Sequence, residues 1–76
     1  RIYMVNLSNI SEGDTCQIKW IMLDGYAASA VAHLGIKVGS VIKILVNAFG
    51  DLVILINNKR IAINRSIAEK IRVSIV

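Results

Sequence analysis

His33 and Cys16 are the side chains of this sequence best suited to hold a metal or to act as a nucleophile. His33 has no Asp, Glu or Cys within one helical turn, and the five acidic residues fall singly in predicted turns. A metal site needs three or four ligands, and general acid–base catalysis needs two titratable groups held close together. Cys16 lies on the predicted inner face of a strand, where a thiol packs as a small hydrophobic group. The sequence therefore predicts a protein that is not an enzyme, with no catalytic residue, no metal site and no cofactor.

Phosphate and nucleic-acid binding have little support in the sequence. Gly35 and Gly39 are isolated and lack the Lys-Ser or Lys-Thr context of a nucleotide-binding loop. Small barrels that bind single-stranded nucleic acids stack bases on aromatic side chains, which here are Tyr3, Trp20, Tyr26 and Phe49. Trp20 is assigned to the core, so no stacking surface and no nucleic-acid partner are expected. A weak, salt-sensitive nucleic-acid-binding barrel stays open as an alternative because basic residues gather late in the chain: Lys59, Arg60, Arg65 and Arg72.

Size and composition predict one small domain, residues 1–76, with more apolar side chains than its core can bury. Hydrophobic residues make up 55% of the chain and the mean hydropathy is +0.62, whereas a domain of this length buries only about 60% of its unfolded surface. No apolar run approaches the roughly 18 residues of a membrane-spanning helix. The single cysteine fits a reducing compartment, so we expect a cytoplasmic protein. Most of the net charge of +4 comes from residues 51–76.

Small side chains predict a short helix over residues 26–34. Its buried stripe is predicted from apolar residues at helical spacing, namely Ala27, Ala30, Val31 and Leu34. The opposite side carries short or polar side chains that let another backbone approach, namely Ala28, Ser29, Ala32 and His33. Asp24 is placed to cap the start of this helix, and Gly35 is placed to end it with a positive φ.

Alternating apolar residues predict strands at residues 15–22, 40–46, 52–57 and 60–64, and a closing strand in which Ile71, Val73 and Ile75 face inward. In the first strand, the residues expected to face inward are Cys16, Ile18, Trp20 and Met22. A two-residue turn is predicted at Asn58-Lys59, and residues 65–70 are long enough for one helical turn. The pattern predicts a mainly β fold. It is a small SH3-like barrel of about five strands, with one short α-helix and a helical turn before the last strand.

The hairpin formed by residues 40–46 and 52–57 is apolar on both faces. Its inward residues are predicted to be Ile42, Ile44, Val46, Leu52, Ile54 and Ile56. Its outward residues are then Val41, Leu45, Val53 and Leu55, with Lys43 as the only charge among them. A half-solvated hairpin should carry polar residues on its outer face, so this face predicts contact with another protein. The predicted partner-binding residues are Ala28, Ser29, Ala32, Val41, Leu45, Val53, Leu55, Lys59 and Arg60. Burial of the same face in a homodimer is the alternative.

Several motifs in order along the chain resemble the FeoA family. They are Leu7-Ser8, Gly13-Asp14, Leu34-Gly35-Ile36 with Gly39, Phe49-Gly50, Ile61-Ala62-Ile63, and Ala68 with Lys70-Ile71. FeoA proteins are small accessory proteins of bacterial ferrous iron uptake with an SH3-like domain. The resemblance implies a non-enzymatic cytosolic protein that contacts the membrane transporter FeoB and is peripheral to the membrane only through that partner. The same type of domain occurs at the C-terminus of metal-dependent repressors. The resemblance therefore also implies an alternative, in which the chain is a regulatory domain of that repressor type.

Two features of the sequence depart from the FeoA pattern. Family members usually carry long basic side chains in the middle of the helix, where this sequence has Ser29 and Ala30. A proline often follows the Leu-Gly-Ile element, where Val38 stands here. Contact through a charged helix is therefore disfavoured for this chain, and contact through small or apolar side chains is favoured.

Overall fold

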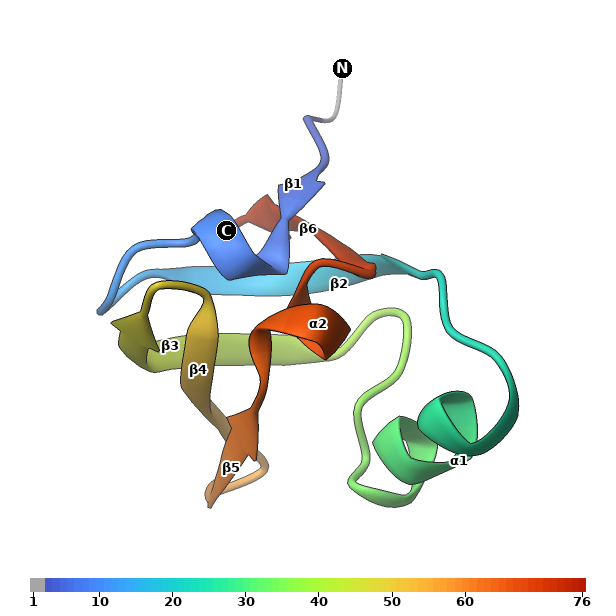
Figure 1. Cartoon of the computed structure of the whole chain (residues 1–76). Helices are drawn as coiled ribbons and strands as arrows, with labels where there is room; N and C mark the ends of the chain where they lie inside the picture. The colour runs from blue at the N-terminus through green and yellow to red at the C-terminus, as the bar shows by residue number, and fades with distance from the viewer. Residues whose placement is uncertain (1–2) are drawn as a thin grey trace.

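The computed structural model describes residues 3–76 and consists of one bent antiparallel sheet with short helical elements (Figure 1). The elements are β1 (Val5–Asn6), η1 (Leu7–Asn9), β2 (Thr15–Ile21), α1 (Gly25–His33), β3 (Val41–Ala48), β4 (Asp51–Ile56), β5 (Lys59–Ile63), α2 (Arg65–Ala68) and β6 (Ile71–Ile75). Strand order in the sheet is β1-β6-β2-β3-β4-β5. The predicted mainly β, SH3-like fold is confirmed, and β1 adds a sixth strand at one edge.

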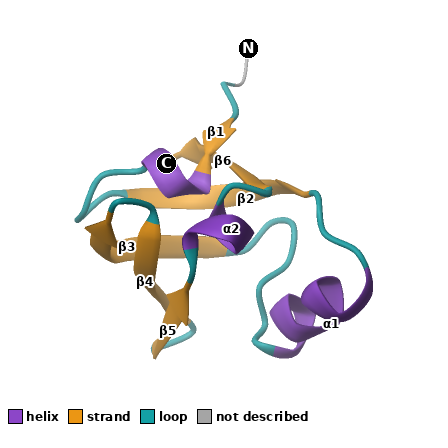
Figure 2. Cartoon of the chain, viewed as in Figure 1, coloured by secondary structure: helices purple, strands orange, loops and turns teal. Residues whose placement is uncertain are grey.

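The core lies inside the bent sheet and draws on almost every element. Its buried residues are Leu7, Ile10, Cys16, Ile18, Val31, Ile36, Ile42, Ile44, Leu52, Ile54, Ile56, Ile61, Ile63, Ala68, Ile71 and Val73. Fully burying a Val, Leu or Ile side chain stabilises a fold by about 1.5–3 kcal/mol, so this group is the main favourable term in folding. Figure 2 shows α2 against the strands and α1 at one side, joined to the sheet by loops at both of its ends.

Two β-bulges reverse the predicted alternation of inward and outward residues. The pairing of β2 with β6 shifts register between Ile18 and Trp20, and Trp20 is 54% exposed rather than in the core. The pairing of β3 with β4 shifts between Ile44 and Val46, and Val46 is 42% exposed rather than inward. Both predictions were wrong because a bulge adds one residue to one strand, which moves the residues after it to the other face. Ile75, also predicted inward, is exposed at the last residue of β6.

The end of α1 forms as predicted, but its buried stripe does not. Gly35 has φ +82° and its N–H donates to the Ala32 carbonyl at 3.0 Å, while the Ile36 N–H donates to the Val31 carbonyl at 3.2 Å. These two bonds are the Schellman motif, which needs a positive φ and therefore favours glycine. Of the predicted stripe only Val31 is buried; Ala27 is half-buried, and the exposed members are Ala30 and Leu34. The prediction was wrong because α1 stands beside the sheet and only part of this face is covered.

Local side-chain chemistry defines the remaining turns. The turn between β4 and β5 is Asn57-Asn58, one residue earlier than predicted, and both residues have positive φ, as a type I′ turn requires. Asparagine tolerates this conformation better than lysine does, which places the turn before Lys59. Asp24 occupies the N-cap position of α1, although its side chain makes no capping hydrogen bond. Asn64 does cap α2, since its side chain accepts from the Ile67 N–H at 3.0 Å.

Candidate functional site

The outer surface of β3, β4 and β5 is a shallow apolar hollow. Val46, Val53 and Ala62 are cross-strand neighbours and form its central row. The hollow has a volume of about 550 Å³ and is lined by Val46, Ala48, Asp51, Leu52, Val53, Ala62, Ile63 and Asn64. We call it the outer sheet hollow. Exposed apolar side chains gathered in one concave place are typical of a contact surface for another molecule.

A second apolar gap, the β5–α1 groove, lies between α1 and β5 and borders the first. It has a volume of about 160 Å³ and is lined by Ala27, Ala30, Val31, Leu34, Ala62, Ile63, Asn64 and Ile67. Because Ala62, Ile63 and Asn64 line both spaces, β5 joins the outer sheet hollow to the helix. The groove-lining side of α1 and the hairpin surface thus form a continuous apolar path, although this is not the helix face that was predicted to bind a partner.

The structure brings together only part of the residues predicted to bind a partner. On the strands, Leu45, Val53 and Leu55 are half-buried, whereas Val41 is 53% exposed. Leu55 stands between Lys43 and Arg60 as a cross-strand neighbour, next to the row of the outer sheet hollow. Val41 pairs with Gln17 of β2, away from the β4–β5 pairing.

The helix residues that face the groove are not those that the sequence singled out. Ala28, Ser29 and Ala32 do not line it, while the opposite stripe, predicted to be buried, does. Val46 and Ala62 were absent from the predicted set. Val46 was missed because of the β3 bulge, but Ala62 was already recognisable as outward from its place between Ile61 and Ile63.

Basic side chains flank this surface without carboxylate partners. Lys59 and Arg60 are exposed on β5, and Lys43 is exposed on β3. Within residues 3–76 the only ion pair joins Arg65 to Glu69, 3.0 Å apart. These three basic side chains therefore make no ion pair within the described part of the chain, while one carboxylate, that of Asp51, lines the hollow itself and accepts a hydrogen bond from the Arg65 N–H.

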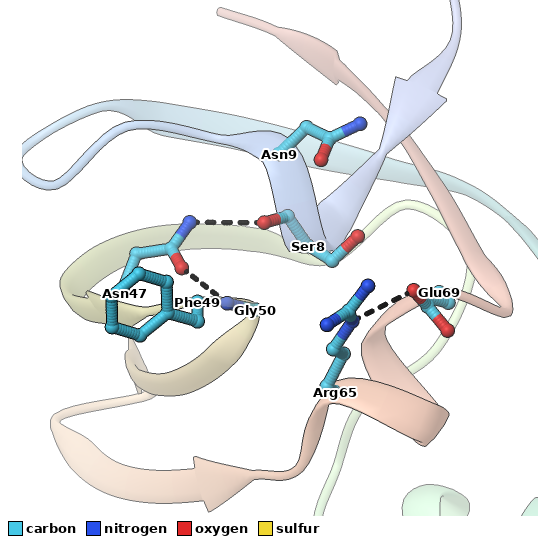
Figure 3. A pocket seen from close by; sticks show the side chains of 7 residues that line it. All are labelled: Ser8, Asn9, Asn47, Phe49, Gly50, Arg65 and Glu69. Carbon is cyan, nitrogen blue, oxygen red and sulfur yellow. Dashed lines mark hydrogen bonds and ion pairs between the residues drawn. The ribbon is translucent and has the colours of Figure 1, made fainter.

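A third hollow, of about 440 Å³, is polar, and its groups are bonded to one another (Figure 3). The Asn47 side chain donates to the Ser8 carbonyl at 3.0 Å and to the Ile10 carbonyl at 2.8 Å, and its oxygen accepts from the Gly50 N–H at 2.9 Å. Every hydrogen-bonding group of that side chain except one lone pair is thus used within the fold. This hollow is best explained as the place where hydrogen bonds of Asn47 connect η1 to the β3–β4 turn.

Phe49 and Gly50 form the turn beside this polar hollow. Phe49 has φ +55° and is 93% exposed, a conformation that is uncommon for a bulky residue. Gly50 has φ +96°, and a Cβ there would stand 2.8 Å from Cγ of Arg65. Glycine is needed at position 50 because the backbone has a positive φ there and because α2 approaches the turn too closely for a Cβ.

Cys16 has the surroundings of a structural group, and His33 stands apart from other possible metal ligands within residues 3–76. Cys16 is completely buried, and burial, followed by the charge of Asp14, raises its pKa from 9.0 to about 11. The thiol is therefore protonated at neutral pH, whereas nucleophiles and metal ligands act as thiolates. His33 is exposed at the end of α1. Over residues 3–76, no three His, Cys, Asp or Glu side chains come together as possible metal ligands.

The aromatic side chains lie on different segments. Tyr3 precedes β1, Trp20 is on β2, Tyr26 is on α1 and Phe49 is in the β3–β4 turn. All four side chains are exposed. The predicted burial of Trp20 therefore no longer argues against stacking of nucleic-acid bases on this side chain. Among the described residues, no helix is long and apolar enough to cross a membrane.

Comparison with known families decides the assignment of the chain. The sequence model of the FeoA domain matches residues 5–75. The chain belongs to the FeoA family. The resemblance inferred from its motifs is thereby confirmed, and the matched range spans all the strands of the FeoA domain described above. A search of curated proteins gave no match.

Solved structures give the same result for the FeoA fold. A crystal structure of an iron uptake regulatory protein, FeoA, is 26% identical with a TM-score of 0.86, and the match covers 97% of this chain and 100% of that one. Iron(II) transport protein A from Clostridium thermocellum is 28% identical with a TM-score of 0.88, covering 95% of this chain and 46% of that one. IdeR from T. acidophilum is 22% identical with a TM-score of 0.89, covering 100% of this chain and 36% of that one. At that identity, the likeness to IdeR concerns the fold alone.

Proposed function

We propose that this protein is a non-enzymatic accessory or regulatory protein of bacterial ferrous iron uptake, and that it acts in the cytoplasm by contact with the transporter FeoB. Membership of the FeoA family is the observation that carries this proposal. The two similar structures above 25% identity are named for iron uptake regulation and iron(II) transport, which supports the same role. The fold-level likeness to repressors adds no support for a repressor function.

The outer sheet hollow is the proposed contact surface for FeoB. Val46, Val53 and Ala62 present apolar area that the core does not use, and the neighbouring Leu55 extends it. Burial of apolar surface contributes about 25 cal/mol per Å² before the costs of association are subtracted. The basic residues at its margin favour a partner surface with negative charge. Binding of this kind alters a transporter through contact alone and needs no chemistry from the bound protein.

The proposal is tested by binding to the purified cytoplasmic segments of FeoB, with and without Fe(II). Val46→Lys is the informative variant because Val46 is 42% exposed, so the fold tolerates a charge that a closed interface does not. We expect its Kd to be at least about tenfold higher than that of the parent. Leu45→Lys and Leu55→Lys are harder to interpret because both leucines are half-buried. Weaker binding by these variants would combine loss of stability with loss of contact.

Val38→Lys is the matched control, because Val38 is 61% exposed in the loop between α1 and β3 and lines neither apolar space. It should bind like the parent. Circular dichroism establishes that both variants are folded. Equal binding by the parent and by folded Val46→Lys would show that the outer sheet hollow is not the contact, and absence of binding by the parent would overturn the proposed partner.

A further inference from the structure

The free edge of β5 carries backbone hydrogen-bonding groups that the sheet does not use. β5 is last in the strand order and pairs only with β4. In a two-residue turn the residue after the turn donates its N–H to the residue before it, so Lys59 bonds to Ile56 across Asn57-Asn58. Antiparallel pairs alternate between bonded and unbonded, which directs the N–H and C=O groups of Arg60 and Ala62 away from β4.

α1 lies beside this edge but covers it incompletely. Ala62 and Ile63 of β5 and Ala30 and Leu34 of α1 line the β5–α1 groove together, and only Val31 of the helix is buried. The groove has a volume of about 160 Å³. A dry apolar cavity of about 150 Å³ holds a benzene molecule, so this space accepts one large apolar side chain.

The charges along the edge favour an acidic occupant. Lys59 and Arg60 are successive exposed residues of β5, and neither has a carboxylate within ion-pair distance among residues 3–76. Beyond β4, strand β3 adds Lys43, which lies across Leu55 from Arg60. Lysine and arginine on an edge strand also discourage pairing with a second copy of the same edge, which carries the same charges. Charge complementarity therefore selects a different chain that carries carboxylates.

We propose that the edge of β5 binds an extended acidic segment of its partner, which adds to the sheet as a further strand. The backbone of the segment bonds to Arg60 and Ala62, one of its apolar side chains enters the β5–α1 groove, and its carboxylates lie beside Lys59 and Arg60. Strand addition of this kind takes its affinity from the main chain and its specificity from pockets for alternate side chains. The inference rests on the proposed function for the identity of the partner, a cytoplasmic segment of FeoB.

Ala62→Pro against Ala62→Val is the direct test. Proline at position 62 removes the N–H that points away from β4, and an edge position of this kind tolerates proline. Valine adds a side chain of similar size and keeps the N–H. With the purified cytoplasmic segments of FeoB as probe, we expect Ala62→Pro to raise Kd by about tenfold relative to Ala62→Val. Equal Kd values for the two folded variants would overturn strand addition.

Hydrogen exchange of the unmodified protein gives the same test without a substitution. Amides bonded to an added strand are protected, so exchange of the Arg60 and Ala62 amides should slow by about tenfold or more in the complex. Unchanged exchange at both amides in a formed complex would refute the proposal whether or not Ala62→Pro folds.

The charge of the occupant is tested by Arg60→Glu against Lys70→Glu. Lys70 is exposed just before β6, which is separated from β5 by several strands in the sheet. Only Arg60→Glu should raise Kd, and equal effects would show that general charge rather than the β5 edge is recognised. If Val46→Lys weakens binding while Ala62→Pro and Ala62→Val have equal Kd values, the proposed function stands and strand addition fails. If the parent does not bind, both fail.

Discussion

Cys16 shows how its position in the sheet determines the chemistry of a single residue. The thiol lies on β2 opposite Ile42 on one side and Ile75 on the other, and no part of it is exposed. Loss of hydration disfavours the thiolate, and the nearby charge of Asp14 adds to that effect. Cys16, which the sequence predicted to pack as a small hydrophobic group, is for these reasons an inert part of the core.

The raised pKa of Cys16 predicts a loss of stability in alkaline solution. The thiol has a pKa of about 11 in the folded protein against 9.0 ordinarily, so between these values the unfolded chain binds fewer protons than the folded one. The free energy of unfolding is then unaffected below pH 9 and falls by about 2 to 3 kcal/mol as the pH rises to 11. Urea unfolding at several pH values measures this fall.

Cys16→Ala is the comparison for that measurement. The cavity it leaves lowers stability at every pH, but the variant has no thiol to titrate. The parent should lose its advantage over Cys16→Ala progressively between pH 9 and pH 11. A difference between the two proteins that stays constant over this range would contradict the raised pKa.

Asn47 links separate elements into one unit. It lies near the end of β3, yet its side chain bonds to carbonyls of Ser8 and Ile10 and to the N–H of Gly50. Its own N–H donates to a carboxylate oxygen of Glu12 at 2.9 Å. The residue therefore holds η1, the following loop and the β3–β4 turn in place, and so supports the strands on which the outer sheet hollow is built.

Asn47→Ala is expected to destabilise the fold by about 2 to 3 kcal/mol, because it removes three hydrogen bonds and leaves partly buried backbone groups without partners. Urea unfolding monitored by circular dichroism measures the change. Asn9→Ala serves as the control, since Asn9 lines the same polar hollow but is exposed and its side chain makes no hydrogen bond within residues 3–76. Similar losses in both variants would contradict the linking role of Asn47.

At the scale of the whole molecule, net charge and the open edges of the sheet govern association. The chain carries a formal charge of +4 and the sheet ends in β1 and β5, neither of which closes on the other by strand pairing. A two-fold dimer through the outer sheet hollow would gather the positive charges at its margin, Lys43 and Arg60, from both copies around one interface. Like charges facing one another at an interface are unfavourable.

We therefore predict a monomer at low micromolar concentration and moderate salt, to be measured by sedimentation velocity. The homodimer considered as an alternative would appear as a species of twice the mass of 8.3 kDa. A dimer that Val46→Lys dissociates and Val38→Lys does not would assign the outer sheet hollow to self-association. That result would contradict its use as a free surface for another partner.

Much of the local structure was predictable from short-range chemistry. The two-faced hairpin, the Gly35 helix end and the helical turn at α2 depend on residue type and spacing within a few positions. The family assignment was also predictable, because its motifs are spread over nearly the whole chain. The site was predictable only in outline. Val53 and Leu55 were named correctly as outward, but Val46 and the groove-facing stripe of α1 were not.

The sequence by itself determined the class of the fold, the positions of most strands and the excess of apolar side chains over core volume. These properties follow from composition and from periodicity along the chain. Only the tertiary structure decided which apolar residues stay exposed. Bulges at Ile18/Trp20 and Ile44/Val46 arise from pairing between strands, and the incomplete cover of β5 by α1 depends on how loops place the helix. The bulges and the position of α1 are both determined by contacts between segments that are distant in sequence. The periodicity within a single segment therefore cannot predict them.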